Sequence, residues 1–294
     1  MTNRRNFLKS ALAGSAALAA SHAMALPTDR PEKFDETYDV IVVGAGGSGL
    51  AAAAHAAEKG LKVLILEKMA FPGGSSAICG GGSLVVGTDL QKKAGEKDSN
   101  ELLFKDILET GGGLNNQDVV HAFVDNHLSV YDWFMGLGGK LQSDLLFASV
   151  SANRGVEIEP NSVLKACLDH AKKHGAKLLV STQARRLAYD QKTKRIVGVF
   201  AEKDGKTVSF GAKKGVILAS GGFARNKDLL AKYVPRMAKT LTICGKGCDG
   251  DGLKMALAYG ADVVDMPYIK ATFAFNTDPH SINDSHYTYW EGGI

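Results

Sequence analysis

Cysteine is scarce in this sequence, and its four copies form no metal or haem motif. Four cysteines in 294 residues are too few for a disulfide scaffold, and no Cys-x-x-Cys-His string for haem attachment occurs. Cys244 and Cys248 could pair in an oxidising compartment, although three intervening residues match neither a redox nor a zinc pair. The eight histidines show no metal-ligand spacing either. We therefore expect structural cysteines and no metal site.

A hydrophobic run long enough to cross a membrane is also missing near the N-terminus. The apolar stretch Ala11 to Ala20 is far shorter than the roughly 20 residues that a spanning helix needs. It lies between Arg4-Arg5-Asn6-Phe7-Leu8-Lys9 and Ala23-Met24-Ala25, which is the order of a twin-arginine (Tat) signal peptide. A basic arm ahead of a surface helix would not need the small-x-small site. We expect cleavage near Ala25, passage through the Tat export machinery, a periplasmic location and no stable membrane span.

An excess of charge is absent once the expected signal is set aside. Residues 1–25 hold three of the 35 Lys and Arg residues and no acid, so 32 basic residues face 31 acidic ones in the remainder. No cluster of Lys and Arg with interleaved aromatics follows, which argues against a nucleic-acid partner. With 45% hydrophobic and 22% charged residues, the composition is that of an ordinary globular protein.

What the sequence does contain is a βαβ pattern at its start. Tyr38 to Val43 is a continuous apolar run, typical of a buried parallel strand, and a glycine-rich turn follows directly. An alanine-rich helix from Leu50 to Glu58 and a second apolar strand from Leu61 to Leu66 come next. Glu67 stands at the end of that strand.

The turn Gly44-Ala45-Gly46-Gly47-Ser48-Gly49 has the G-x-G-x-x-G form of a dinucleotide site. Gly44 permits the bend, Gly46 lets the backbone approach a pyrophosphate, and Gly49 lets the helix pack on the strand. The phosphates would lie at the helix N-terminus, and Glu67 would accept hydrogen bonds from a ribose. An ordinary glycine turn is the simpler alternative, but the strand, helix and acid around it favour a dinucleotide.

The remaining pattern predicts an α/β fold. Helices are expected over Glu101–Leu108, Val119–Phe134 and Ser162–His174, and strands over Lys177–Thr182, Ile196–Glu202 and Val216–Ala219, the last one buried. We expect a doubly wound, Rossmann-like sheet with an antiparallel accessory hairpin between Leu178 and Phe210.

A second glycine-rich loop, Gly73-Gly74-Ser75-Ser76-Ala77-Ile78-Cys79-Gly80-Gly81-Gly82, follows Glu67 where a plain NAD dehydrogenase would continue into a helix. This loop resembles that of the flavoprotein family of soluble fumarate reductases, urocanate reductases and 3-oxosteroid dehydrogenases. Two later strings strengthen the resemblance: Ala219-Ser220-Gly221-Gly222-Phe223 and Gly250-Asp251-Gly252-Leu253-Lys254-Met255-Ala256. The resemblance covers residues 38 to 294 and implies an FAD-binding domain over 38–265, after a linker over 26–37.

The resemblance also implies cofactor contacts. It assigns FAD to sixteen residues: Gly44, Ala45, Gly46, Ser48, Gly49, Glu67, Lys68, Gly74, Ser75, Ser76, Gly81, Gly82, Ala184, Ala219, Gly221 and Asp251. Ordinary turns at Ser75 and Ser76, and a helix N-cap at Asp251, are the alternatives for single residues. No catalytic residue is assigned, since Arg154 and Arg236 are better explained as surface or salt-bridge residues.

The sequence departs from the family pattern at one substrate position. Family members resembling fumarate reductase carry a His-Pro-Thr string after Asp-Met-x-Tyr-Ile, whereas here Thr272 stands in place of the histidine. Fumarate itself is therefore not expected as the substrate. Phe273, Phe275, Tyr287, Tyr289 and Trp290 would suit a larger or less charged acceptor.

The resemblance implies that family members continue beyond residue 294 through a capping domain, so we expect 266–294 to be the start of an incomplete one. The expected function is FAD-dependent hydride transfer between flavin and an activated C=C bond of a small molecule. A separate cytochrome or quinol-linked partner would supply the electrons. The alternatives are a 3-oxosteroid-type dehydrogenase, and an FAD-binding fragment that does not turn over or that pairs with another chain.

Overall fold

The computed structural model describes residues 29–269, 276–277 and 280–281. Its helices are α2 (Gly47–Glu58), α3 (Asp89–Ala94), α4 (Asn100–Thr110), α5 (Gln117–Leu137), α6 (Pro160–Lys173), α7 (Lys227–Tyr233) and α8 (Asp251–Leu257), with 3-10 turns η1 (Gly74–Ile78) and η2 (Pro235–Met237). Its strands are β1 (Glu36–Val43), β2 (Val63–Leu66), β3 (Gly82–Leu84), β4 (Phe147–Ser149), β5 (Ala152–Glu157), β6 (Lys177–Leu179), β7 (Thr182–Asp190), β8 (Arg195–Lys203), β9 (Lys206–Leu218), β10 (Asn276–Thr277) and β11 (His280–Ser281).

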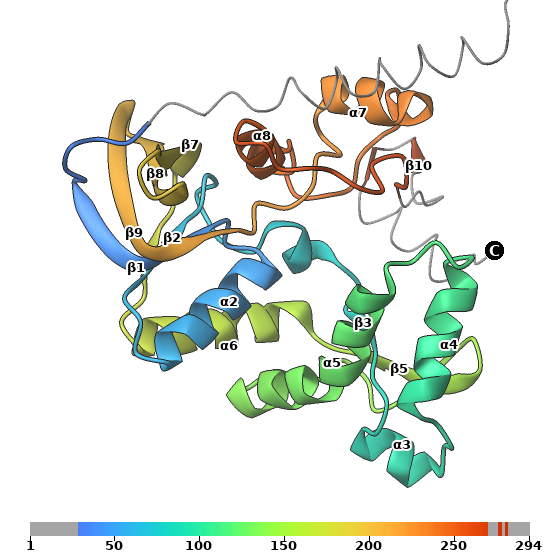
Figure 1. Cartoon of the computed structure of the whole chain (residues 1–294). Coiled ribbons are helices and arrows are strands. Elements are labelled where there is room, and N and C mark those ends of the chain that lie inside the picture. Colours follow the sequence, from blue (N-terminus) through green and yellow to red (C-terminus); the bar gives the residue numbers. More distant parts are fainter. Residues whose placement is uncertain (1–28, 270–275, 278–279, 282–294) are drawn as a thin grey trace, which may run out of the picture.

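One six-stranded sheet organises the molecule, with the strand order β6-β2-β1-β9-β8-β7 (Figure 1). The first four strands are parallel, and β9, β8 and β7 continue the sheet in antiparallel pairs. The expected α/β class with a Rossmann-like parallel sheet is confirmed. Val43, Leu66 and Leu218 pair in register at one edge, so the loops that leave β1, β2 and β9 start side by side.

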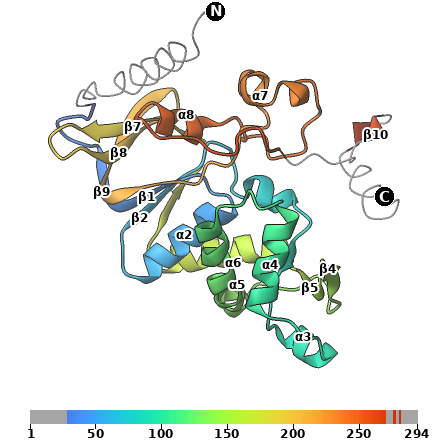
Figure 2. The same cartoon turned by 45° about the vertical axis from the view of Figure 1, so that its right-hand side comes forward.

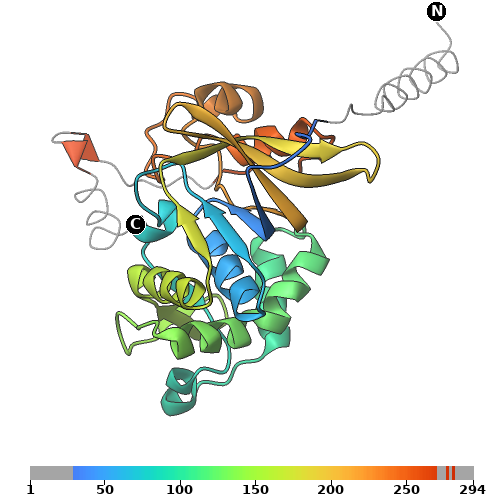
Figure 3. The same cartoon turned by 90° about the vertical axis from the view of Figure 1, so that its left-hand side faces the viewer.

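The two faces of the parallel strands are covered differently. Alternate side chains of β1 and β2, such as Val42 and Ile65, pack against α2 and α6, which lie together under the sheet (Figure 1). The opposite side chains, such as Ile41 and Leu64, pack against residues of β7, β8 and Met255 of α8. The antiparallel strands therefore curl over the face that a second helix layer covers in a fully doubly wound fold, as Figure 3 shows.

The predicted hairpin is present, but two strand predictions were wrong in detail. The expected single strand Lys177–Thr182 is divided, because Ser181 adopts a positive φ of 48° and turns the chain from β6 into β7. The expected strand Val216–Ala219 is the end of the 13-residue β9, and there Ile217 and Leu218 are 39% and 37% exposed instead of buried. The backbone of β9 is paired on both sides, by β1 and β8. The side chains of Ile217 and Leu218 are only partly covered by other residues in the described part of the chain.

Residues 82–157 form a separate layer of helices with a small antiparallel sheet of order β3-β5-β4, and Figure 2 shows this layer to the right and lower right of α2. A small core of Val86, Leu103, Val120 and Val124 holds α4, α5 and the segment that follows β3 together. The helices α3, α4 and α5 begin at side-chain caps, which are Thr88, Ser99 and Asn116 respectively. Trp133 and Phe134 of α5 pack this layer against the core around α2 and α6.

Several predictions fall outside the described residues. They are the signal segment 1–25, Thr272 with the nearby aromatics at 273, 275, 287, 289 and 290, and most of the expected capping segment 266–294. The domain boundaries therefore stay predictions. Within 29–35, Arg30 pairs with Asp190 at 2.9 Å, so this part of the expected linker is attached to β7. Across the described residues, no helix has the length and apolar character needed to cross a bilayer.

Candidate functional site

The glycine turn after β1 is shaped by two close backbone contacts. Gly44 has a φ of +105°, and a Cβ there would lie 2.4 Å from the Ala219 carbonyl oxygen at the end of β9. A Cβ on Gly49 would lie 2.0 Å from the Gly44 carbonyl oxygen. Only glycine fits these two positions, because a side chain would push the turn, α2 and β9 apart.

The turn places the N-terminus of α2 at the wall of a cavity of about 580 Å³. Gly46 caps the helix in an extended conformation, and the first turn contains no acidic residue. A Cβ at Gly46 would meet nothing nearer than 3.8 Å, so this face of the turn is open. Gly46 has no side chain to occupy the helix N-terminus, so the N–H groups of the first turn other than that of Gly47, together with the helix dipole, can attract the anionic pyrophosphate.

Glu67 directly follows β2 and lines the cavity beside the glycine turn. Its side chain is buried, and its two carboxylate oxygens accept hydrogen bonds from the backbone N–H groups of Ala45 at 2.9 Å and Met69 at 2.8 Å. The structure thus holds the acid at the position that a ribose-binding residue needs, between the turn and the end of β2. Its hydrogen bond to a ribose stays a prediction.

A charged cluster lines the neighbouring wall. The Lys68 amine donates to Asp249 Oδ1 at 2.6 Å and to Asp251 Oδ2 at 3.0 Å, and Gln183 Nε2 donates to the same Asp251 oxygen at 2.8 Å. Burial disfavours the charged amine, but the hydrogen bonds to both carboxylates outweigh it and raise the pKa of Lys68. Burial opposes ionisation of Asp251 as well, yet its bonds to Lys68 and Gln183 lower its pKa. Lys68 and Asp251 therefore both stay charged at neutral pH.

The second glycine-rich loop packs against the first. Gly73 and Gly74 adopt positive φ values of 128° and 55°, and η1 then brings two serines to the cavity. Ser76 Oγ accepts the Gly47 N–H at 3.1 Å, and Ser75 Oγ accepts the Gly245 N–H at 3.0 Å. These hydroxyls tie the loop to α2 on one side and to the segment before α8 on the other.

The structure brings most of the sixteen expected residues to this one cavity. The residues that line it are Gly44, Gly46, Ser48, Glu67, Lys68, Gly74, Ser75, Ser76, Ala184, Ala219, Gly221 and Asp251. Ala45 and Gly49 lie in the same turn, behind the lining. Gly81 and Gly82 lie further away at the start of β3, where a Cβ on Gly81 would come within 1.9 Å of the Ile158 carbonyl oxygen. The close contact with Ile158 is enough to require glycine at position 81.

Sequence reasoning did not identify several residues of the cavity wall. Asn161, Thr182, Gln183, Arg225, Cys244 and Cys248 all line the cavity. Gln183 could have been inferred from its place beside Ala184, whereas the segment 244–248 has no periodic pattern that would have predicted it. A second cavity of about 550 Å³ shares Gln183, Ala184 and Asp251 with the first and continues along β7 and α8.

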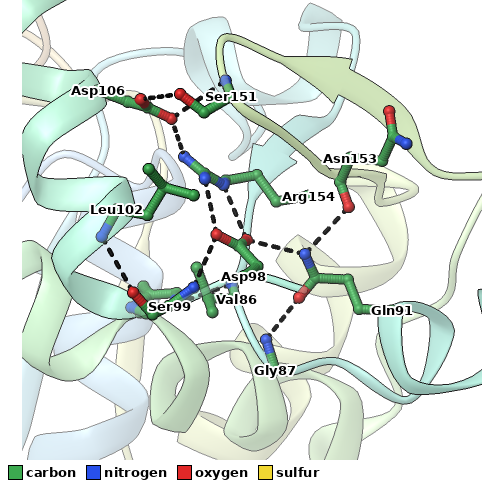
Figure 4. Close-up of polar contacts among 11 residues, drawn as sticks. Val86, Gly87, Gln91, Asp98, Ser99, Leu102, Asp106, Ser151, Asn153 and Arg154 are labelled. Carbon is green, nitrogen blue, oxygen red and sulfur yellow. Dashed lines mark hydrogen bonds and ion pairs between the residues drawn. The ribbon is translucent and has the colours of Figure 1, made fainter. Parts of the chain in front are cut away.

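The two arginines considered as catalytic candidates lie elsewhere. Arg154 is fully buried and forms ion pairs with Asp98 at 2.7 Å and Asp106 at 2.5 Å, inside the helical layer (Figure 4). Gln91 and Ser151 complete this network through Asp98 and Asp106 respectively. Arg236 is exposed on η2. Neither lines the cavity, which agrees with structural and surface roles. Within the described residues, no group of three or more His, Cys, Asp and Glu residues could hold a metal ion.

Comparison with known proteins decides which dinucleotide the cavity serves. The family model described as an FAD binding domain matches residues 39–274, which include both glycine loops and the Lys68 cluster. This chain belongs to the FAD-binding domain family. Its cofactor is FAD, and the open helix N-terminus and the two close-packed glycine loops fit the extended shape of that cofactor.

The relatives of this FAD-binding chain are named as reductases. It is 34% identical to a urocanate reductase of Eggerthella lenta over 82% of this chain and 41% of the relative, and 31% identical to a fumarate reductase (cytochrome) of Shewanella frigidimarina over 80% and 42%. A solved 3-ketosteroid-delta4-(5alpha)-dehydrogenase from Rhodococcus jostii RHA1 superposes with a TM-score of 0.76 and 25% identity, covering 82% of this chain and 58% of that one. The chain thus spans about two fifths of the length of these two sequence relatives.

Proposed function

We propose that this chain is the FAD-binding part of a reductase that adds a hydride to an activated C=C bond. The observation that carries the proposal is the cavity at the carboxyl edge of the sheet, in a chain whose relatives are named fumarate and urocanate reductases. FAD, when bound, supplies the hydride chemistry. The chain itself would bind the phosphates at α2, hold the adenosine side between Glu67, Gln183 and Asp251, and keep the second loop in place through Ser75 and Ser76.

An unsaturated carboxylic acid is the substrate class that we propose. Fumarate and urocanate, in the names of the two relatives, are both of this class. Thr272, in place of the family's histidine, supports an acid other than fumarate. A steroid enone is less well supported, because the sequence relatives are reductases and the steroid dehydrogenase is similar at 25% identity.

We also propose a periplasmic location and a separate electron donor. The twin arginines Arg4 and Arg5, the apolar run and Ala23-Met24-Ala25 support export in the folded state. The relative from Shewanella carries a cytochrome in its name, which supports a cytochrome-type or quinol-linked partner for this chain. If the Tat route is used, a variant with both Arg4→Lys and Arg5→Lys should stay in the cytoplasm. Cell fractionation would show this. Unchanged periplasmic recovery of that variant would contradict it.

Reoxidation of the reduced protein tests the reaction. The FAD-loaded chain is reduced with dithionite without oxygen and mixed with fumarate, urocanate, acrylate or a steroid enone, while the flavin absorbance is followed. Return of the oxidised spectrum with an unsaturated acid, faster than for free reduced FAD, would support the proposal. Reoxidation by the enone alone would favour the steroid alternative. A loaded chain that no acceptor reoxidises would contradict reductase activity of this chain alone.

A further inference from the structure

Two cysteines that are four positions apart in the sequence line the wall of the FAD cavity. Cys244 and Cys248 both line it, and the three residues between them form a tight turn in which the Cys248 N–H donates to the Gly245 carbonyl oxygen at 3.0 Å. Burial and the neighbouring Cys248 thiol raise the pKa of Cys244 to about 11. Ser75 Oγ accepts the Gly245 N–H at 3.0 Å and lies 3.1 Å from the Cys248 sulfur, so the turn brings Cys248 close to the residue that follows Cys244.

The backbone at both cysteines is held by Arg225. Its guanidinium donates to the Cys244 carbonyl oxygen from Nη2 at 2.8 Å and from Nε at 3.0 Å, and its backbone N–H donates to the Cys248 carbonyl oxygen at 2.9 Å. One residue thus fixes the two ends of the turn. Fixed backbone at both cysteines favours a close thiol pair, because neither end can move away without breaking these bonds.

Cys248 touches residues that are expected to bind the cofactor. The Cys248 sulfur lies 3.1 Å from Ser75 Oγ, and it would lie 3.3 Å from a Cβ placed on Gly221. Ser75 and Gly221 both line the cavity, and so does Cys244. By contrast, Cys79 is exposed outside this lining, and Cys167 is buried in the core between α2 and α6. Cys244 and Cys248 therefore line the FAD cavity, whereas Cys79 and Cys167 do not.

We propose that Cys244 and Cys248 form a dithiol–disulfide couple that exchanges two electrons with the FAD bound in this cavity. In the forward direction both S–H bonds break, one S–S bond forms, and two electrons and two protons pass to oxidised FAD, giving reduced FAD. The reverse step returns the two thiols. The couple stores a second electron pair beside the flavin. This proposal rests on FAD binding in the cavity but not on any particular substrate.

The first test needs no cofactor. The 294-residue chain is equilibrated with glutathione buffers of graded redox potential, alkylated with a maleimide and analysed by peptide mass. The proposal expects one disulfide that joins Cys244 to Cys248, forms in oxidising buffer and opens in reducing buffer. Cys79→Ser should leave it unchanged, and Cys248→Ser should abolish it. Full alkylation of Cys244 and Cys248 in the most oxidising buffer, or pairing with another cysteine, would overturn the proposal.

The second test counts electrons. The FAD-loaded, fully oxidised chain is titrated with dithionite without oxygen, after its FAD content has been measured by absorbance. The wild type and Cys79→Ser should take up twice as many electrons per FAD as Cys244→Ser and Cys248→Ser. Equal uptake in all four proteins would overturn the proposal. A doubled uptake in a protein that no unsaturated acid reoxidises would leave this inference standing while the proposed reductase function failed.

Discussion

The Ser76 hydroxyl accepts a hydrogen bond from the backbone N–H of Gly47 at 3.1 Å, across 29 residues of sequence. This contact joins the second glycine-rich loop to the first turn of α2. Glu67 accepts a hydrogen bond from the Ala45 N–H, in the glycine turn just before α2. The two loops and the acid after β2 therefore position one another around the cavity, which makes each of them sensitive to changes in the others.

Replacing Ser76 with alanine should weaken FAD binding about fivefold. The hydroxyl is lost as an acceptor for Gly47, and a hydrogen bond of this kind contributes about 1 kcal/mol. The dissociation constant can be measured from the recovery of FAD fluorescence on dilution. Ser129→Ala is the matched control, because that exposed hydroxyl bonds only locally, to the Asn126 carbonyl oxygen. Equal affinities for the two variants would show that the Ser76–Gly47 contact does not support the site.

Gly44→Ala should destabilise the fold by about 1 to 3 kcal/mol more than Gly60→Ala. Both glycines have a positive φ, but a Cβ at Gly60 meets nothing within 4 Å, whereas one at Gly44 meets the Ala219 carbonyl oxygen. Urea denaturation gives the free energy of unfolding for each variant. If the two variants lost the same stability, the close approach of the turn to β9 would not matter.

Arg154→Met should lower the free energy of unfolding by about 3 to 5 kcal/mol, because Asp98 and Asp106 would be left buried without their cation. Arg236→Met, on the exposed η2, should change it by less than about 0.5 kcal/mol. Adding Asp98→Leu and Asp106→Leu to Arg154→Met should restore part of the loss. A loss of FAD affinity in the folded Arg154→Met protein would instead give Arg154 a role at the cofactor.

The Lys68–Asp251 pair should contribute to stability across neutral pH and lose its effect at both extremes. The pKa of Asp251 is lowered from 3.8, so its contribution is present above that value and is lost as the pH falls through the lowered pKa. The pKa of Lys68 is raised from 10.5, so its contribution is lost as the pH rises through the raised pKa.

Measuring the free energy of unfolding of wild type and Asp251→Asn from pH 3 to pH 9 tests this dependence, with the exposed Asp132→Asn as control. The difference between wild type and Asp251→Asn should be constant from about pH 5 to pH 9 and shrink toward pH 3. A difference that grew as the pH fell would contradict the ion pair.

The βαβ start of the fold could be predicted because its signals are local. The apolar runs of β1 and β2, the glycine turn and Glu67 all lie within 38–67, and the structure places them as expected. The second loop and Asp251 were expected at the same site through the family resemblance, since no spacing rule joins Ser75 to Asp251.

The rest depended on contacts between distant residues. The strand β9 was expected only over Val216–Ala219, yet pairing with β1 and β8 extends it to 13 residues. The segment 244–248, whose residues line the cavity, was not predicted as part of the site for a similar reason. Its position is set by Arg225 and Ser75, which lie far from each other in the sequence and contact it only in the fold.

The most direct test of the central claim, that this cavity holds FAD, is the number of FAD molecules per chain in wild type and Gly46→Val. A Cβ at Gly46 would meet nothing nearer than the Gly73 carbonyl oxygen at 3.8 Å, and Gly46 lines the cavity, so we expect the turn to accept a valine that takes up space needed by the cofactor. If the cavity holds FAD, the wild type carries about one FAD per chain, and a Gly46→Val chain with an unchanged circular dichroism spectrum carries almost none. A folded wild type that binds no FAD, or a variant that binds it equally well, would show that FAD does not bind here.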